Sequence, residues 1–258
     1  MSRKVPPSLT ALGRKSLPEE IDVNGQRYVL RRTFKNDFFA VTAMYEHKGE
    51  KVILKVGRQA SFLLVPLGWI GRILARREQA IMQRLQGIEG IPQFIGRWGP
   101  TGIVREYIEG HPLAKGEQVS DDFFPRLRRQ IDQIHTEGLA YVDLEKCENV
   151  LVGDDGRPYL FDFQISWYLP PWWGGELWPA RKLRQWFQAG DRYHVVKLQR
   201  RTRPDQLTLE EVALSYRRPW YIRVQRFLAW PFTKVRRVVL NRIDPRRRSG
   251  ERGRIAEE

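Results

Sequence analysis

Short runs of β-branched and aromatic residues alternate with turn residues near the start of the chain. Three such runs lie at residues 26–34, 38–46 and 51–56, and a His-Lys-Gly turn separates the last two. Runs of this composition predict β-strands, and connections this short predict antiparallel pairing. We therefore expect three consecutive antiparallel strands after a polar leader at residues 1–25.

An amphipathic helix follows these strands in the pattern. Apolar residues recur every three or four positions from Leu67 to Leu85, which is the spacing of one face of an α-helix. Two further strands are predicted at residues 93–97 and 102–108, on either side of a Gly-Pro-Thr turn. Together these strands and the helix would form a small lobe at residues 26–105.

The next part of the chain predicts a helix and a hairpin. Residues 123–135 carry helical spacing that ends at Gly138, and residues 149–152 and 157–161 flank an Asp-Asp-Gly turn. Helices are expected to dominate beyond the hairpin. The pattern thus predicts an α+β fold with two lobes, a small antiparallel sheet with one helix and then a mainly helical lobe at residues 106–215.

The composition excludes several classes of protein. A chain of 258 residues with 41% hydrophobic residues can bury a substantial core, which excludes a wholly disordered protein. Cys147 is the one cysteine, so we expect no internal disulfide and a reducing, cytosolic compartment. The longest uncharged stretches, 59–71 and 163–175, have 13 residues each, fewer than the roughly 18 that a membrane-spanning helix needs. We also expect no secretory signal.

The net charge of +15 is concentrated in the last third of the chain. Residues 165–258 contain 21 Lys and Arg against 9 Asp and Glu, a net charge of +12, whereas residues 1–164 are nearly balanced. An apolar stripe with basic residues on other faces runs from Trp220 to Val239, which is typical of a helix lying at a membrane surface. We therefore predict that residues 216–258 form a basic amphipathic tail that contacts an anionic membrane; nucleic acid is the alternative partner.

Aromatic residues also gather between Phe163 and Trp178, where five Trp and Tyr residues accompany two prolines. Two interpretations fit this segment equally well, namely contact with a membrane interface and packing inside a helical lobe. Residues 62–70, which include Trp69, also have two equally good interpretations, namely a further membrane contact and core packing beneath the predicted helix.

Two charged residues lie where apolar residues are expected. Lys55 interrupts the apolar run of a predicted strand, and Glu78 lies on the apolar stripe of the predicted helix. A buried charge without a partner is costly, so the two are predicted to pair with each other. The alternative is that Lys55 is an edge-strand charge and Glu78 marks the rim of the stripe.

A second group of polar residues surrounds the predicted hairpin. The hairpin folds its arms together, so Asn149 and Asp162 should finish at the same end, and their oxygens suit Mg²⁺. Asp143, six residues before Asn149, is close enough to accept a proton from an incoming hydroxyl. Asp and Asn are also common turn formers, and we adopt that interpretation for Asp154 and Asp155.

The sequence resembles the protein-kinase-like fold over about residues 26–164, and within that fold it is most similar to small bacterial lipopolysaccharide (Kdo/heptose) kinases and RIO-like kinases. The features that carry the resemblance are, in order, Lys55, Glu78, the Tyr-Val-Asp ending at Asp143, Asn149 and the Asp-Phe-Gln beginning at Asp162. Their order makes the combination far more specific than any one of them.

The resemblance implies a role for each matching residue. Lys55 would hold the α- and β-phosphates of ATP, and Glu78 would orient Lys55. Glu106 and Ile108 would form a hinge that offers backbone hydrogen bonds to adenine. Asp143 would orient or deprotonate the acceptor hydroxyl, and the pair Asn149 and Asp162 would hold Mg²⁺.

Several positions depart from the family pattern. No glycine occurs between the first two predicted strands, where the family carries a Gly-rich loop, and the segment from Lys35 to Asp37 is predicted to form a tighter turn there, with Lys35 as a nucleotide contact. Val142 replaces the arginine of His-Arg-Asp, and Gln164 replaces the glycine of Asp-Phe-Gly. Lys146 is the candidate for the family's catalytic lysine. These departures argue against an ordinary regulated protein kinase.

The predicted function is therefore an ATP- and Mg²⁺-dependent kinase that phosphorylates a hydroxyl at the cytoplasmic face of a membrane, with a lipid-linked sugar such as lipopolysaccharide core as acceptor. Two alternatives remain open. One is an atypical RIO-like protein serine/threonine kinase, and the other is a pseudokinase or binding module that presents its basic tail to membrane or RNA.

Overall fold

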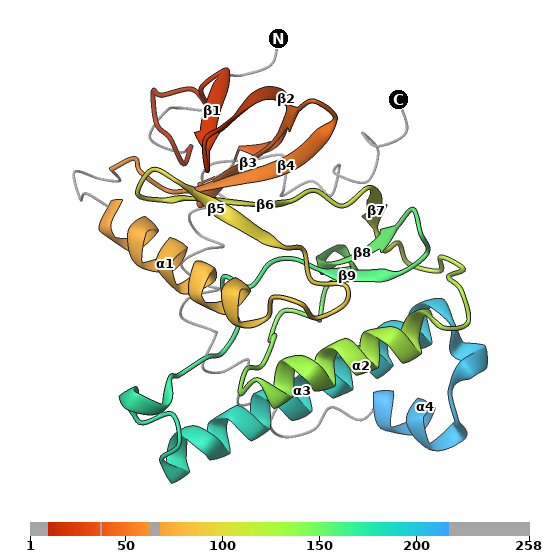
Figure 1. The fold of residues 1–258 in the computed structure, drawn as a ribbon. Coiled ribbons are helices and arrows are strands. Elements are labelled where there is room, and N and C mark those ends of the chain that lie inside the picture. The colour runs from red at the N-terminus through yellow and green to blue at the C-terminus, as the bar shows by residue number, and fades with distance from the viewer. Residues whose placement is uncertain (1–9, 37, 62–67, 217–258) are drawn as a thin grey trace.

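Figure 1 shows a computed structural model of the chain, which describes residues 10–36, 38–61 and 68–216. The fold is α+β, as expected, with a curled antiparallel sheet at the top of the view and a group of helices below it. The sheet has one hydrophobic cluster, and the helical part below it has another.

The upper part is an antiparallel sheet with the strand order β1-β2-β3-β4-β6-β5. Its strands are β1 (Glu20–Val23), β2 (Gln26–Asn36), β3 (Ala40–His47), β4 (Glu50–Gly57), β5 (Phe94–Trp98) and β6 (Gly102–Glu106). The two outer strands, β1 and β5, contact each other, so the sheet curls around a core that includes Tyr28, Tyr45 and Leu54. Gly96 permits this closure, because a Cβ there would lie 2.8 Å from Val23 Cγ1.

Helix α1 (Gly68–Arg84) packs on the outer face of the sheet, against β4, β5 and β6. Its buried residues Ala75, Glu78, Ile81 and Met82 follow the helical spacing that predicted it. Because Ile81 and Met82 belong to the core of the lower part, α1 connects the two halves of the molecule.

The lower part combines helices with a small second sheet (Figure 1). The helices are α2 (Phe123–Thr136), α3 (Trp178–Thr202) and α4 (Leu209–Tyr216), with short 3₁₀ turns η2 (Cys147–Asn149), η3 (Pro171–Trp173) and η4 (Pro204–Gln206). The second sheet has the order β7-β8-β9, formed by β7 (Gly110–Pro112), β8 (Val150–Gly153) and β9 (Pro158–Leu160).

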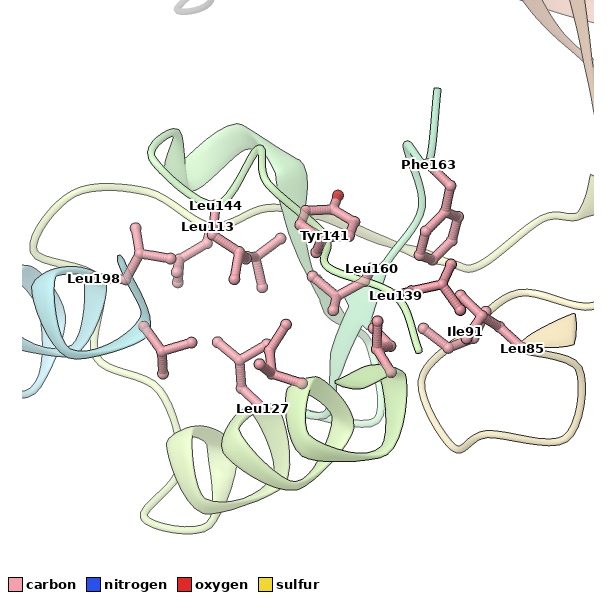
Figure 2. Packing of buried hydrophobic residues seen from close by; sticks show 14 of the residues in the cluster. Leu85, Ile91, Leu113, Leu127, Leu139, Tyr141, Leu144, Leu160, Phe163 and Leu198 are labelled. Atoms are coloured by element: carbon pink, nitrogen blue, oxygen red, sulfur yellow. The ribbon is translucent and has the colours of Figure 1, made fainter. Parts of the chain in front are cut away.

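The core of the lower part lies between α2 and the second sheet, and it reaches the end of α1 at Leu85 (Figure 2). Leu127 projects from α2 into this core, and Leu160 enters it from β9. Tyr141 and Phe163 also lie in it, which fixes the two segments that carry Asp143 and Asp162 to the same buried cluster.

Two strands were missed by the sequence analysis. β1 lies inside the segment expected to be a polar leader, where Ile21 and Val23 are buried on alternate positions. β7 has three residues and was not predicted. The predicted basic tail lies outside the described residues, apart from its first residue, Tyr216, which ends α4. Among the described helices, none is long and apolar enough to cross a membrane.

Candidate functional site

The two charges that were predicted to pair are in direct contact. Lys55 Nζ lies 2.9 and 3.0 Å from the two carboxylate oxygens of Glu78, and 2.9 Å from Asp162 Oδ1. Lys55 comes from β4, Glu78 from α1, and Asp162 follows β9. One ammonium group therefore joins the sheet, its outer helix and the lower part of the molecule.

The alternative interpretation of this pair is wrong. Lys55 is opposite Thr42 on one side and Ile103 on the other, so it lies on a central strand rather than an edge. Glu78 is 4% exposed and lies on the buried face of α1 rather than at the rim of the apolar stripe.

Burial and neighbouring charges shift the pKa values of all three groups in the cluster. Burial raises the pKa of Glu78 above its ordinary value, although the ammonium of Lys55 opposes that shift. The pKa of Lys55 lies above its ordinary value, because burial lowers it but the carboxylates of Glu78 and Asp162 more than offset that effect. Burial raises the pKa of Asp162, but Lys55 and, more weakly, Lys35 hold that pKa below its ordinary value. The ammonium thus lies between two carboxylates, with Asp162 the more exposed of the two.

Lys35 lies on β2 rather than in a turn. The tight turn predicted from Lys35 to Asp37 is wrong for Lys35 and Asn36, because β2 continues to Asn36 through register shifts before Arg32 and before Lys35, and Asp37 lies outside the described residues. Lys35 is opposite Thr42, which in turn is opposite Lys55, so Lys35 lies on the same face of the sheet as the cluster.

Arg105 is a second basic residue at this cluster, and the sequence analysis missed it. It is two residues after Ile103, the partner of Lys55, so its side chain lies on the same face of the sheet. Its guanidinium carbon lies 5.3 Å from the centre of the Phe161 ring. Burial lowers the pKa of Arg105 against the attraction of Glu78 and Asp162. The signal was available, since Arg105 interrupts an apolar strand as Lys55 does.

The segment between α2 and β8 places Asp143, Lys146 and Asn149 together. Asn149 Nδ2 donates to the backbone carbonyl of Asp143 at 2.7 Å, which leaves its amide oxygen for another partner. Lys146 Nζ lies 3.7 Å from Asp143 Oδ2. The Asp143 side chain is 22% exposed, so its carboxylate is reachable from solvent.

Tyr141 connects these residues to Asp162. Its hydroxyl lies 3.4 Å from the carbonyl of Asn149, and its ring meets that of Phe163 edge-on at 5.4 Å. Burial raises the pKa of Tyr141 well above its ordinary value, and the negative charges of Asp162, Asp143 and Asp191 add to the shift. The three predicted residues Asp143, Asn149 and Asp162 are therefore gathered around one buried tyrosine.

Asp191 of α3 anchors this segment, and it too was missed. Its fully buried carboxylate accepts the backbone N–H groups of Tyr141 and Val142, each at 2.7 Å, and lies 3.0 Å from His135 Nε2. Asp191 lies on the buried stripe of α3 that also contains Val195 and Leu198. The argument that selected Glu78 would have selected Asp191 as well.

The predicted hinge residues lie where the chain passes between the two parts. Glu106 ends β6, its N–H donates to the carbonyl of Gln93, and its carbonyl accepts from Arg105. Ile108 lies in the connection to β7 and is half-buried. No described hydrogen bond joins the side chain of either residue to the charged cluster.

An open groove of about 470 Å³ lies beside the Asp143 segment. It is lined by Pro112, Leu113, Ala114, Lys115, Glu145, Lys146, Cys147, Glu148 and Arg201. Glu145 lies 3.4 Å from Lys197, which offsets part of the negative charge on this wall. Lys146 lines the groove and its Nζ lies 3.7 Å from Asp143 Oδ2, whereas Asp143 itself is not among the lining residues.

Within the described residues, no group of three or more His, Cys, Asp or Glu side chains could hold a metal ion. The predicted Mg²⁺ ligands are of a different kind, one amide and one carboxylate. Comparison of the sequence with models of known protein families gives no match, and comparison with curated proteins gives none either.

Proposed function

We propose that this protein is an ATP- and Mg²⁺-dependent phosphotransferase with a two-lobed, protein-kinase-like fold, and that it transfers the γ-phosphoryl group to a hydroxyl. The observation that carries this proposal is the contact of Lys55 with both Glu78 and Asp162. Phosphoryl transfer depends on positioning and on neutralising charge rather than on covalent catalysis. The ammonium of Lys55 is fixed beside the carboxylate of Asp162, and the candidate base Asp143 is near that carboxylate. This arrangement suits that requirement.

In this proposal the nucleotide lies on the face of the sheet that carries Lys55. Lys55 holds the α- and β-phosphates, and Glu78 keeps its ammonium in place. Lys35, on the same face, adds positive charge for the phosphates where the chain has no Gly-rich loop. The backbone of Ile108 is proposed to bind adenine together with the carbonyl of Glu106, which has a second lone pair beside the one that Arg105 uses, whereas the Glu106 N–H is committed to Gln93.

The residues present fit a magnesium ion, which usually takes one or two carboxylates and completes its shell with phosphate oxygens and water. Asn149 commits its amide nitrogen to Asp143, which leaves Oδ1 as a ligand. Asp162 uses Oδ1 for Lys55, which leaves Oδ2. When bound, the ion would offset negative charge on the phosphates.

The acceptor is proposed to enter through the groove beside Asp143. Its hydroxyl oxygen attacks the γ-phosphorus, the bond to the bridging oxygen of ADP breaks, and the hydroxyl proton passes to the Asp143 carboxylate. Lys146, 3.7 Å from Asp143, is positioned to stabilise the transferring group. The groove cations Lys115 and Arg201 suit an acceptor that carries an anionic group, such as a lipid-linked sugar of the lipopolysaccharide core.

The experiment uses purified full-length protein, radiolabelled ATP and Mg²⁺, with membrane extract and soluble lysate offered separately as acceptors. We expect label in the membrane fraction, and a loss of transfer of about 100-fold or more in Asp143→Asn and in Asp162→Asn. Asp154→Asn is the matched control, because it removes a carboxylate from the exposed turn of the same hairpin.

Each other outcome selects an alternative. Label confined to soluble protein would favour an atypical protein serine/threonine kinase. ATP binding without transfer to either fraction would favour a binding module. Full transfer by Asp143→Asn or Asp162→Asn would overturn the assignment of these carboxylates.

A further inference from the structure

The turn before α3 carries large apolar side chains on the molecular surface. The most exposed of them are Trp172 (78%), Trp178 (76%), Trp173 (75%), Leu177 (66%) and Ile165 (57%). Three indoles this exposed lie within seven residues, a local density that differs from the singly scattered exposed apolar side chains of an ordinary surface. We call Ile165 together with residues 170–178 the tryptophan turn.

The tryptophan turn has a defined backbone. Pro170 and Pro171 restrict the chain before η3, and Gly174 ends η3 with a φ of +80°. The N–H groups of Trp173 and Gly175 both donate to the carbonyl of Pro170 at 3.0 Å. Gly175 packs so closely on Leu169 that a Cβ there would lie 2.0 Å from the Leu169 carbonyl oxygen. These hydrogen bonds and close contacts define the backbone of the turn that carries the exposed indoles.

The aromatic residues that precede the turn behave differently. Phe163 is fully buried, and the Trp167 ring lies 5.2 Å from that of Phe187, while its backbone pairs with Ala140. The packing interpretation thus holds for the aromatic residues Phe163 and Trp167 of the segment between Phe163 and Trp178, and the later tryptophans are exposed instead.

The charges around the turn are basic. Arg181 and Lys182, in the first turns of α3, are exposed. Glu176, the acidic residue of the segment, lies 3.1 Å from Arg184, which offsets its charge. Exposed tryptophans next to exposed basic residues are the combination that binds the interface of anionic membranes.

We infer that the tryptophan turn is a membrane-docking surface, with its indoles inserted at the interface of an anionic bilayer and Arg181 and Lys182 against the headgroups. A second copy of the chain fits less well, because a symmetric contact would bring Arg181 and Lys182 of both copies together. The inference does not rest on phosphotransfer, and it uses residues other than those of the predicted tail.

The test measures binding of the full-length protein to vesicles of phosphatidylcholine with and without phosphatidylglycerol. We expect binding to the anionic vesicles, and a fall in partition coefficient on the order of tenfold in Trp172→Ser/Trp173→Ser/Trp178→Ser, because the variant loses apolar surface that the interface would cover. Leu209→Ser/Leu214→Ser is the matched control, because it removes exposed apolar side chains from α4 instead. Circular dichroism and thermal unfolding verify that all variants fold.

Quenching by brominated lipid locates the contact. The wild type should lose tryptophan fluorescence in brominated anionic vesicles, and the triple variant should lose most of that quenching. Arg181→Glu/Lys182→Glu should bind anionic vesicles more weakly and keep its weak binding to neutral ones.

Three outcomes would overturn the inference. The first is that the wild type fails to bind anionic vesicles. The second is that the triple variant binds them as well as the wild type does, while Trp220→Ser/Phe227→Ser binds them more weakly. The third is a concentration-dependent dimer, measured by sedimentation, that the triple variant abolishes without any change in vesicle binding. None of these outcomes changes the result expected for Asp143→Asn in the transfer assay.

Discussion

Asp191 accepts the backbone N–H of Val142 at 2.7 Å, and Val142 has a φ of +73°. A β-branched residue strongly disfavours this left-handed conformation, so a neighbouring group must hold it. Asp191 does so from α3 while it also accepts the N–H of Tyr141. The residue immediately before Asp143 is therefore fixed by a carboxylate almost fifty positions later in the chain.

Replacing Asp191 with Asn should release this backbone. The amide keeps one acceptor oxygen but turns its NH₂ group toward the N–H of either Tyr141 or Val142, so one of these donors loses its partner. We expect the free energy of unfolding to fall by about 2–4 kcal/mol in a urea titration, and phosphotransfer to fall with it. Asp132→Asn is the control, because Asp132 makes an exposed ion pair with Arg192 and its loss should cost less than about 0.5 kcal/mol.

Replacing Val142 with Gly should be tolerated, because Gly adopts a positive φ without strain. We expect the free energy of unfolding to stay within about 1 kcal/mol of the wild type, since relief of strain offsets the lost apolar contact. Val150→Gly is the matched control, because Val150 is fully buried at the start of β8 with a φ of −107°. That variant should lose about 2–4 kcal/mol. Equal losses in the two variants would show that Val142 is not strained.

Replacing Lys55 with Met should remove the ammonium that contacts both Glu78 and Asp162, and Arg105 does not replace those hydrogen bonds. Breaking a buried ion pair in this way costs about 3–5 kcal/mol, and adding Glu78→Gln should restore part of that stability. Both variants should lack phosphotransfer. Lys51→Met on the same strand is the control, since Lys51 pairs with Glu109 at the exposed end of β4 and its loss should change stability far less than the loss of Lys55. Additive losses in the double variant would contradict a coupled cluster.

The sequence predicted the parts of the site that can be recognised from the residues next to them in the chain. Lys55 and Glu78 are charges inside apolar periodic segments, and burial without a partner is unfavourable, so the pattern predicted their pairing beside the alternative of an edge-strand charge and a residue at the stripe's rim. Asp191 and Arg105 satisfy the same criterion. They were missed because α3 was treated as part of a basic, aromatic region and Arg105 as part of a hinge.

Other features depend on contacts that no local pattern contains. β1 has four residues, and its place is fixed by pairing with β2 and by contact with β5, more than seventy residues away. The extension of β2 through Lys35 depends on two register shifts against β3, which the alternation of residues does not reveal. The positive φ of Val142 requires Asp191 and could not be expected from a valine.

The stability of the curled sheet should fall at high pH because of Tyr45. Its ring is fully buried and its hydroxyl donates to the carbonyl of Pro18 at 2.8 Å, and burial raises its pKa to about 12 from 10.0. Below pH 10 the tyrosine is neutral in both folded and unfolded chains, so its contribution to stability is fully present. Between pH 10 and 12 the unfolded chain ionises first, so stability is lost as the pH rises toward the folded-state pKa.

From pH 9 to pH 11 this loss should amount to about 1.3 kcal/mol in the wild type relative to Tyr45→Phe. The variant should be less stable by about 1 kcal/mol at pH 7, because it lacks the hydrogen bond to Pro18, and the difference should shrink or reverse by pH 11. Urea titrations of both proteins at pH 7, 9 and 11 measure this difference in the free energy of unfolding. A difference that stays constant across this range would mean that the Tyr45 hydroxyl ionises as readily in the folded chain as in the unfolded one.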